Sequence, residues 1–232
     1  MITSKASPAE LSVISSFSAN VLRRFNVDVN ATKPLNSFQI ADSIDPDFII
    51  DLICAPFQNE MTNIRSLKRY DVGMVVKYLQ RSHNEYLYKR IPEIERTLEI
   101  LTEGFSNNSA FAIAINSLFS SYREHLIEHI NYEEERLFPY ALSLHGTYTL
   151  SAEQSMMLYN YSSMQFLAEH NHSPIDISVI IKLFKAYRPD EMNASPYRLL
   201  IQQINAFKED MNIHELLEDH VLVPKLIELE MA

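Results

Sequence analysis

The sequence predicts an all-α protein, an up-down four-helix bundle with a small N-terminal helical module. Three observations predict it. The 232 residues include only three glycines and are 47% apolar, which suits helices around a real core better than a turn-rich sandwich. From Tyr70 onward, four long stretches carry apolar residues at helical spacing. Short polar segments separate these stretches, and connections of that length join antiparallel neighbours in a bundle.

The chain begins with a segment of different character. Two short apolar stretches, 11–25 and 48–56, flank a region rich in turn-forming residues. This pattern predicts a small helical module over residues 1–65. The four long helical patterns then assign residues 66–232 to the bundle.

Composition excludes several classes of protein. Thirty acidic residues against 20 basic ones give a net charge of −10, and no Lys/Arg cluster is present, so we expect no nucleic-acid partner. No apolar run approaches the roughly 18 residues needed to span a bilayer, so we expect no membrane partner. Residues 1–8 lack the pattern of a secretory signal, and the single cysteine, Cys54, excludes an intrachain disulfide. A cytoplasmic protein is therefore predicted.

The second and fourth helical patterns repeat each other 85 positions apart, as His129 is matched by His214 and Glu133 by Glu218. Both patterns form one apolar helical face with a His and a Glu at its middle. The first face comprises Ile115, Phe119, Tyr122, Leu126, His129, Glu133 and Leu137. The second comprises Leu200, Ile204, Phe207, Met211, His214, Glu218 and Leu222.

The first and third helical patterns each add one histidine on an apolar face. His83 precedes His129 by 46 residues, and His170 precedes His214 by 44. The same pattern therefore occurs twice along the bundle sequence: a histidine, a loop and then His-x-x-x-Glu. Such agreement between the repeat and the apolar faces is not expected of surface residues.

This constellation predicts a metal centre. A buried carboxylate costs several kcal/mol unless it is paired or bound to a cation, and neither repeated face carries a Lys or Arg. Residues at i and i+4 project from one side of a helix, so each His-x-x-x-Glu can grip one centre. Mixed nitrogen and oxygen ligation suits two iron ions bridged by two carboxylates, with Mn or Zn as substitutes. The predicted ligands are His83, His129, Glu133, His170, His214 and Glu218.

A rival motif lies on the second helical pattern. His125, Glu128 and His129 spell H-x-x-E-H, in which two histidines would bind Zn²⁺ and the glutamate would act as the general base of a hydrolase. The repeat counterpart of His125 is Asp210, so the zinc pair is not echoed. Glu134, Glu135 and Asp219 fall off the apolar faces and are interpreted as solvated.

With these residues in place, the sequence resembles the hemerythrin-like di-iron proteins that repair iron–sulfur clusters (RIC proteins). The resemblance covers about residues 70–229. It rests on His83 in RSHNEYLYKRIPEIE, His129 and Glu133 in HINYEEERLFP, His170 in LAEHNHSP, and His214 and Glu218 in HELLEDHVLVP.

The resemblance also extends to the N-terminal module, with one departure. Family members often carry there a Cys-Cys pair after a short helix, and NVLRRFNVDVNATKP is similar as far as Val29. Asn30 and Ala31 stand near the positions where the cysteines are expected. The resemblance therefore implies a module without the family's thiol pair.

Three functions remain open at this point. The resemblance implies a metal-binding protein of the nitrosative or oxidative stress response, rather than a conventional enzyme, that repairs or protects iron–sulfur clusters through labile iron or NO/O2 chemistry. Its partners would be a diatomic ligand (NO or O2) and damaged iron–sulfur proteins. The alternative is a non-enzymatic O2/NO sensor module that signals through a partner protein. The third is the zinc hydrolase built on His125, Glu128 and His129.

Overall fold

The computed structural model describes residues 2–40, 44–103, 110–170, 176–187 and 194–232, with the side chains of Glu169, His170, Tyr187 and Ala194 outside the description. Within these ranges every regular element is a helix. The prediction of an all-α protein is confirmed. None of the described helices combines the length and the apolar content needed to cross a bilayer.

The N-terminal part consists of short helices. They are α1 (Pro8–Ser12), α2 (Ser16–Arg24), η1 (Leu35–Ser37), α3 (Pro46–Cys54), η3 (Ala55–Phe57) and α4 (Glu60–Leu67). Side-chain caps fix where several of them begin. Ser15 accepts a hydrogen bond from the Ser18 amide at the start of α2, and Asn59 accepts one from Thr62 at the start of α4. Each such cap stabilises its helix by about 1 kcal/mol.

The rest of the chain forms long helical rows. The first row is α5 (Val72–Glu85), η4 (Tyr86–Arg90) and α6 (Ile91–Glu103). The second is α7 (Ala110–Tyr132), η5 (Glu133–Leu137) and α8 (Phe138–Leu144). The short helix α9 (Ala152–Met157) leads to a third row, α10 (Ser163–His170) and α11 (Ser178–Tyr187). The fourth is α12 (Ala194–Leu217), η6 (Glu218–Leu222) and α13 (Val223–Glu230).

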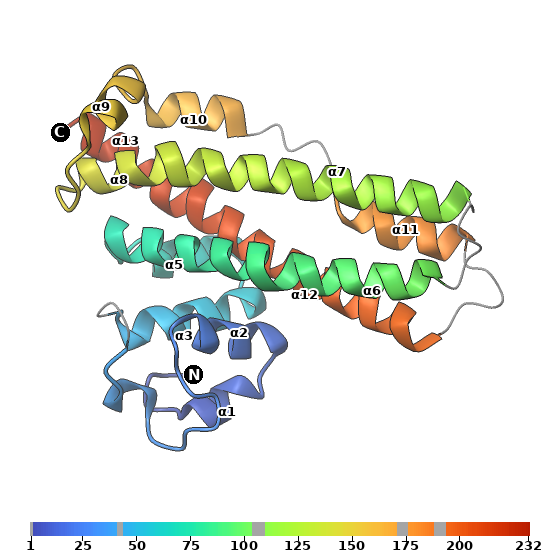
Figure 1. Cartoon of the computed structure of the whole chain (residues 1–232). Helices are drawn as coiled ribbons and strands as arrows, with labels where there is room; N and C mark the ends of the chain where they lie inside the picture. Colours follow the sequence, from blue (N-terminus) through green and yellow to red (C-terminus); the bar gives the residue numbers. More distant parts are fainter. Residues whose placement is uncertain (1, 41–43, 104–109, 171–175, 188–193) are drawn as a thin grey trace.

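The rows lie side by side and alternate in direction (Figure 1). Contacts link α6 to α7 and α12, link α11 to α7 and α12, and link α10 to α13. The N-terminal helices lie below α5 in the view of Figure 1, where α2 contacts both α5 and α12.

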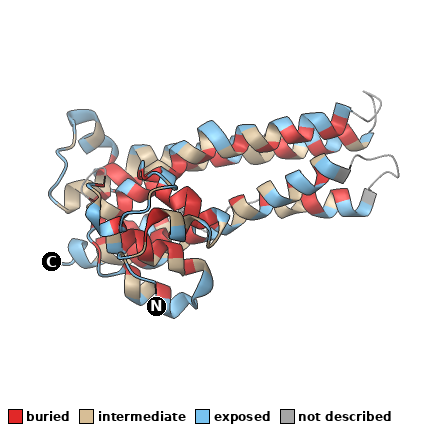
Figure 2. Ribbon diagram, turned by 90° about the horizontal axis from the view of Figure 1, so that it is seen from below, coloured by how far each residue is buried: buried red, intermediate tan, exposed pale blue. Residues whose placement is uncertain are grey.

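Two apolar clusters fill the interior, and the buried residues of both lie on the inner sides of the helices (Figure 2). One joins the N-terminal helices to α5, α8 and α13, and includes Phe17, Phe48 and Leu79. The other fills the far half of the rows, and includes Tyr86, Phe119 and Phe207. A layer of polar side chains lies along the rows between the two clusters.

Candidate metal centre

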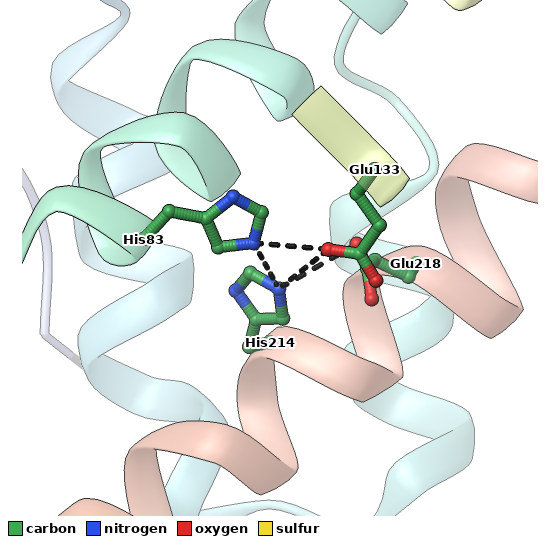
Figure 3. A group of neighbouring side chains, drawn as sticks. All are labelled: His83, Glu133, His214 and Glu218. Carbon is green, nitrogen blue, oxygen red and sulfur yellow. Dashed lines mark hydrogen bonds and ion pairs between the residues drawn. The ribbon is translucent and has the colours of Figure 1, made fainter. Parts of the chain in front are cut away.

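Four buried polar side chains from three rows meet in this layer (Figure 3). His83 lies in the last turn of α5, and His214 lies in the last turn of α12. Glu133 and Glu218 are the first residues of η5 and η6. None of the four is more than 2% exposed. Both halves of the repeat therefore bring their glutamate to one point inside the protein.

The distances within this group are short. The Nε2 atom of His83 lies 3.0 Å from Oε2 of Glu133 and 3.1 Å from Nε2 of His214. The same His214 nitrogen lies 3.9 Å from Oε2 of Glu133 and 3.5 Å from Oε1 of Glu218. One donor atom from each of the four residues falls within 4.8 Å of all the others.

These spacings fit a metal ion. Imidazole and carboxylate ligands bind at about 2.0–2.2 Å, so donor atoms on opposite sides of one ion lie about 4.2 Å apart. A contraction of a few tenths of an ångström would bring the four donors into that range. Two carboxylates and two imidazoles in a water-poor interior are also the chemistry that a hard or borderline divalent cation prefers. The site can therefore hold a metal.

The two buried glutamates have pKa values shifted in opposite directions. Burial raises the pKa of Glu133, but hydrogen bonds from His129, His214 and His83 outweigh burial and hold the pKa well below its usual range. Burial, and then the nearby Glu133 carboxylate, raise the pKa of Glu218 well above its usual range. Burial lowers the pKa of His83, but its bonds to Glu133 and Glu134 reverse this and raise the pKa. Without a cation, protons must balance the two carboxylates.

The backbone carries a matching distortion in three rows. The segments η4, η5 and η6 are π-helical, and each is followed by a proline six positions after its first residue: Pro92, Pro139 and Pro224. Proline has no N–H, and its ring collides with the carbonyl four residues back. In each row the residue before the proline donates instead to the carbonyl five positions back, and in η5 and η6 this carbonyl belongs to the glutamate itself. Two of the three wide turns therefore begin at a candidate ligand, and π segments often lie at functional sites.

Glu134 contacts the candidate site, and the helical pattern missed it. We interpreted it as part of a solvated face, but its Oε1 lies 2.8 Å from Nδ1 of His83 and its Oε2 accepts a hydrogen bond from Gln80. A carboxylate on Nδ1 fixes the ring so that Nε2 faces a metal, an arrangement common at metal sites. The apolar stripe was no guide here because the α-helical period does not hold through the π segment.

One of the two remaining predicted ligands contacts the buried four. His129 is partly exposed, and its Nε2 lies 2.8 Å from Oε1 of Glu133, the oxygen that does not face His83. His170 ends α10, and its side chain lies outside the described part of the chain.

The residues of the rival zinc motif are arranged differently. His125 and Glu128 are both exposed on α7. The Nδ1 atom of His125 lies 2.7 Å from the Ser121 carbonyl oxygen of its own helix. Of the three motif residues only His129 approaches the buried glutamates.

Known proteins offer a comparison for this geometry. The chain is similar to iron–sulfur cluster repair proteins. It is 21% identical to the protein named iron–sulfur cluster repair protein ScdA from Staphylococcus haemolyticus, over 97% of this chain and 99% of that protein. It is 20% identical to the ScdA protein of Staphylococcus epidermidis, over 68% of each chain. These distant relatives support the cluster-repair family. No family model and no solved structure matches the chain.

Proposed function

We propose that this chain is a cytoplasmic non-haem di-iron protein that repairs or protects iron–sulfur clusters during nitrosative or oxidative stress. In this proposal the four rows form an up-down four-helix bundle of the hemerythrin-like kind. The names of the distant relatives support the role in cluster repair.

The observation that carries the proposal is the meeting of Glu133 and Glu218. They come from equivalent positions of a repeat, they are fully buried, and the carboxylates share one group with two imidazoles. In the proposed centre these two carboxylates would hold two irons. His83, His129, His170 and His214 would complete the ligand set.

The protein's own residues would hold and protect such a centre. Glu134 orients His83 through Nδ1, and Phe138 stacks on the His83 ring with centroids 5.3 Å apart. Tyr86 covers His214, with centroids 5.6 Å apart. Bound iron would supply coordination positions left open by six protein ligands, where NO or O2 can bind. An imidazole and carboxylate shell without thiolates should also release ferrous iron more readily than a cysteine site.

The test is restoration of a damaged enzyme. The iron-loaded, reduced protein is mixed with an iron–sulfur enzyme inactivated by nitric oxide, and recovered activity is compared with that from an equal amount of free ferrous iron. We expect greater recovery with the protein, and recovery no better than free iron with Glu218→Ala. Uptake of nitric oxide without any recovery would move the protein to the sensor class. Absence of both nitric-oxide uptake and enzyme recovery would contradict the repair role and the sensor role alike.

A further inference from the structure

The last residue of α2, Arg24, lies buried between the N-terminal helices and two rows of the helical part. Arg24 is 6% exposed and its partner Asp210, on α12, is 1% exposed. Nη1 of Arg24 donates to Oδ1 of Asp210 at 2.8 Å, and Nη2 donates to Oδ2. The guanidinium therefore holds both carboxylate oxygens, the two-pronged geometry that only arginine provides.

The same guanidinium also binds the first row. Nε of Arg24 donates to Oε2 of Glu85 at 2.6 Å, and Nη1 donates to the hydroxyl of Tyr78 at 2.8 Å. Its central carbon lies 5.4 Å and 5.5 Å from the ring centroids of Tyr78 and Tyr86. One side chain from the N-terminal part thus joins α5 and η4 to α12.

This cluster lies directly beside the candidate metal centre. Asp210 precedes His214 by one helical turn on the same face of α12. Tyr86 follows His83 by three residues, donates to Oδ1 of Asp210 at 3.0 Å, and lies with its ring against His214. Any shift of Asp210 or Tyr86 would therefore move one of the two imidazoles whose Nε2 atoms lie 3.1 Å apart.

A buried ion pair is a poor source of net stability, because desolvation offsets much of the attraction, but it strongly favours one arrangement of its partners. Apolar packing already joins α2 to α5, because Leu22 and α5 residues such as Leu79 belong to one buried cluster. The ion pair would fix the position of α12 along α5, and with it the separation of His83 and His214.

We propose that Arg24 is a positioning residue of the metal centre, so that the N-terminal helices are part of the site's framework. The inference rests on the proposed metal site. It predicts that the contacts of the Arg24 guanidinium, rather than the packing of α2 in general, control how firmly iron is held and how its ligands are arranged, although Arg24 does not touch the metal. Loss of a group that is hydrogen-bonded to a metal ligand typically weakens metal binding about 10- to 100-fold. Arg24 acts one step further out, through Asp210 and Tyr86, so we expect a smaller effect.

The experiment uses the whole iron-loaded chain. Three quantities are measured: the rate at which a ferrous chelator removes iron, the Mössbauer spectrum, and the melting temperature of the metal-free form. For Arg24→Met we expect chelator removal to be several-fold faster, up to about 10-fold, and the spectrum to change. Arg24→Lys keeps the charge without the two-pronged contact, and should fall between the wild type and Arg24→Met.

Leu22→Ala is the matched control. Leu22 is fully buried in the same helix, and its truncation weakens α2 docking through lost packing without touching Asp210. It should lower the melting temperature while leaving the spectrum and the iron-removal rate close to wild type. Equal effects of Leu22→Ala and Arg24→Met on all three quantities would overturn the proposal, because general destabilisation would then explain both.

If Arg24→Met does not fold, a double variant still tests the proposal. Arg24→Met combined with Asp210→Asn leaves no unpaired buried charge, and it should fold but still lose iron quickly. Wild-type iron retention and spectrum in this double variant would overturn the positioning role alone. Wild-type protein that takes up no iron would overturn the metal proposal as well, so the two failures are distinguishable.

Discussion

The Nε2 atoms of His83 and His214 face each other at 3.1 Å, beside the carboxylates of Glu133 and Glu218. A nitrogen of a neutral imidazole that faces another nitrogen at this distance needs a proton between them. His83 and His214 would hold a metal ion through these nitrogens in their neutral form. Protons and metal therefore compete for the same four side chains.

The first prediction concerns pH. The raised pKa of His83 means that its contacts stabilise the metal-free fold fully below its unfolded pKa of about 6.5, and that this contribution is lost as pH rises through the folded value. The raised pKa of Glu218 acts in the same direction. The melting temperature of metal-free protein should therefore fall as pH rises above about 6.5.

Metal binding should show the opposite trend. Ligands must lose protons to bind, so iron(II) affinity should rise with pH and binding at pH 7 should release protons. A pH indicator in weakly buffered solution measures this release. Metal uptake without proton release, together with a metal-free melting temperature that rises with pH, would contradict the assigned protonation.

The second prediction separates the two metal motifs. Glu133→Ala and Glu218→Ala should each reduce bound iron sharply, because each removes a carboxylate shared by two ions. His125→Ala and Glu128→Ala should be nearly neutral, since both side chains are exposed. Metal analysis of the four purified variants decides between the motifs. An empty site in His125→Ala and a full one in Glu218→Ala would favour the zinc motif.

The third prediction tests the partner of His83. Glu134→Gln removes the charge that holds Nδ1, and should weaken iron binding about 10- to 100-fold. Its neighbour Glu135 is exposed, so Glu135→Gln is the matched control with the same change of charge. Competition with a calibrated chelator gives both affinities. Equal affinities in the two variants would show that Glu134 does not orient the ligand.

The fourth prediction concerns the π segments. Pro139→Ala restores a backbone N–H and allows an ordinary α-helical turn through residues 133–137, which would redirect Glu133. Iron affinity should fall although Pro139 is not a ligand, while the metal-free fold keeps or gains stability because proline disfavours helix interiors. Pro46→Ala, at the start of α3, is the control and should leave iron affinity unchanged. Unchanged affinity in Pro139→Ala would show that the wide turn is not needed.

The helical class and four residues of the candidate site could be predicted from the sequence. The apolar faces follow the 3.6-residue period, so His83, Glu133, His214 and Glu218 stood on inward stripes, and the structure brings these four together. The roles of all six residues as metal ligands, and the division at residues 65 and 66, stay predictions.

Two contacts could not be predicted from the sequence, for physical reasons. Glu134 lies off the α-helical stripe and reaches His83 where the row is π-helical. The contact between Arg24 and Asp210 joins residues 186 positions apart, and no local periodicity encodes such a pair. One difference between the two repeated helical patterns was visible in the sequence, because Asp210 occupies the position equivalent to His125. In the structure Asp210 is where Arg24 of α2 contacts α12.

Whether one chain holds two irons is decided by metal analysis of anaerobically iron-loaded protein together with its optical spectrum. We expect two iron atoms per chain and near-ultraviolet absorption in the oxidised form. Glu218→Ala, prepared in parallel, should hold less iron and lose that absorption. One tightly held zinc per chain with no uptake of iron would contradict the di-iron proposal.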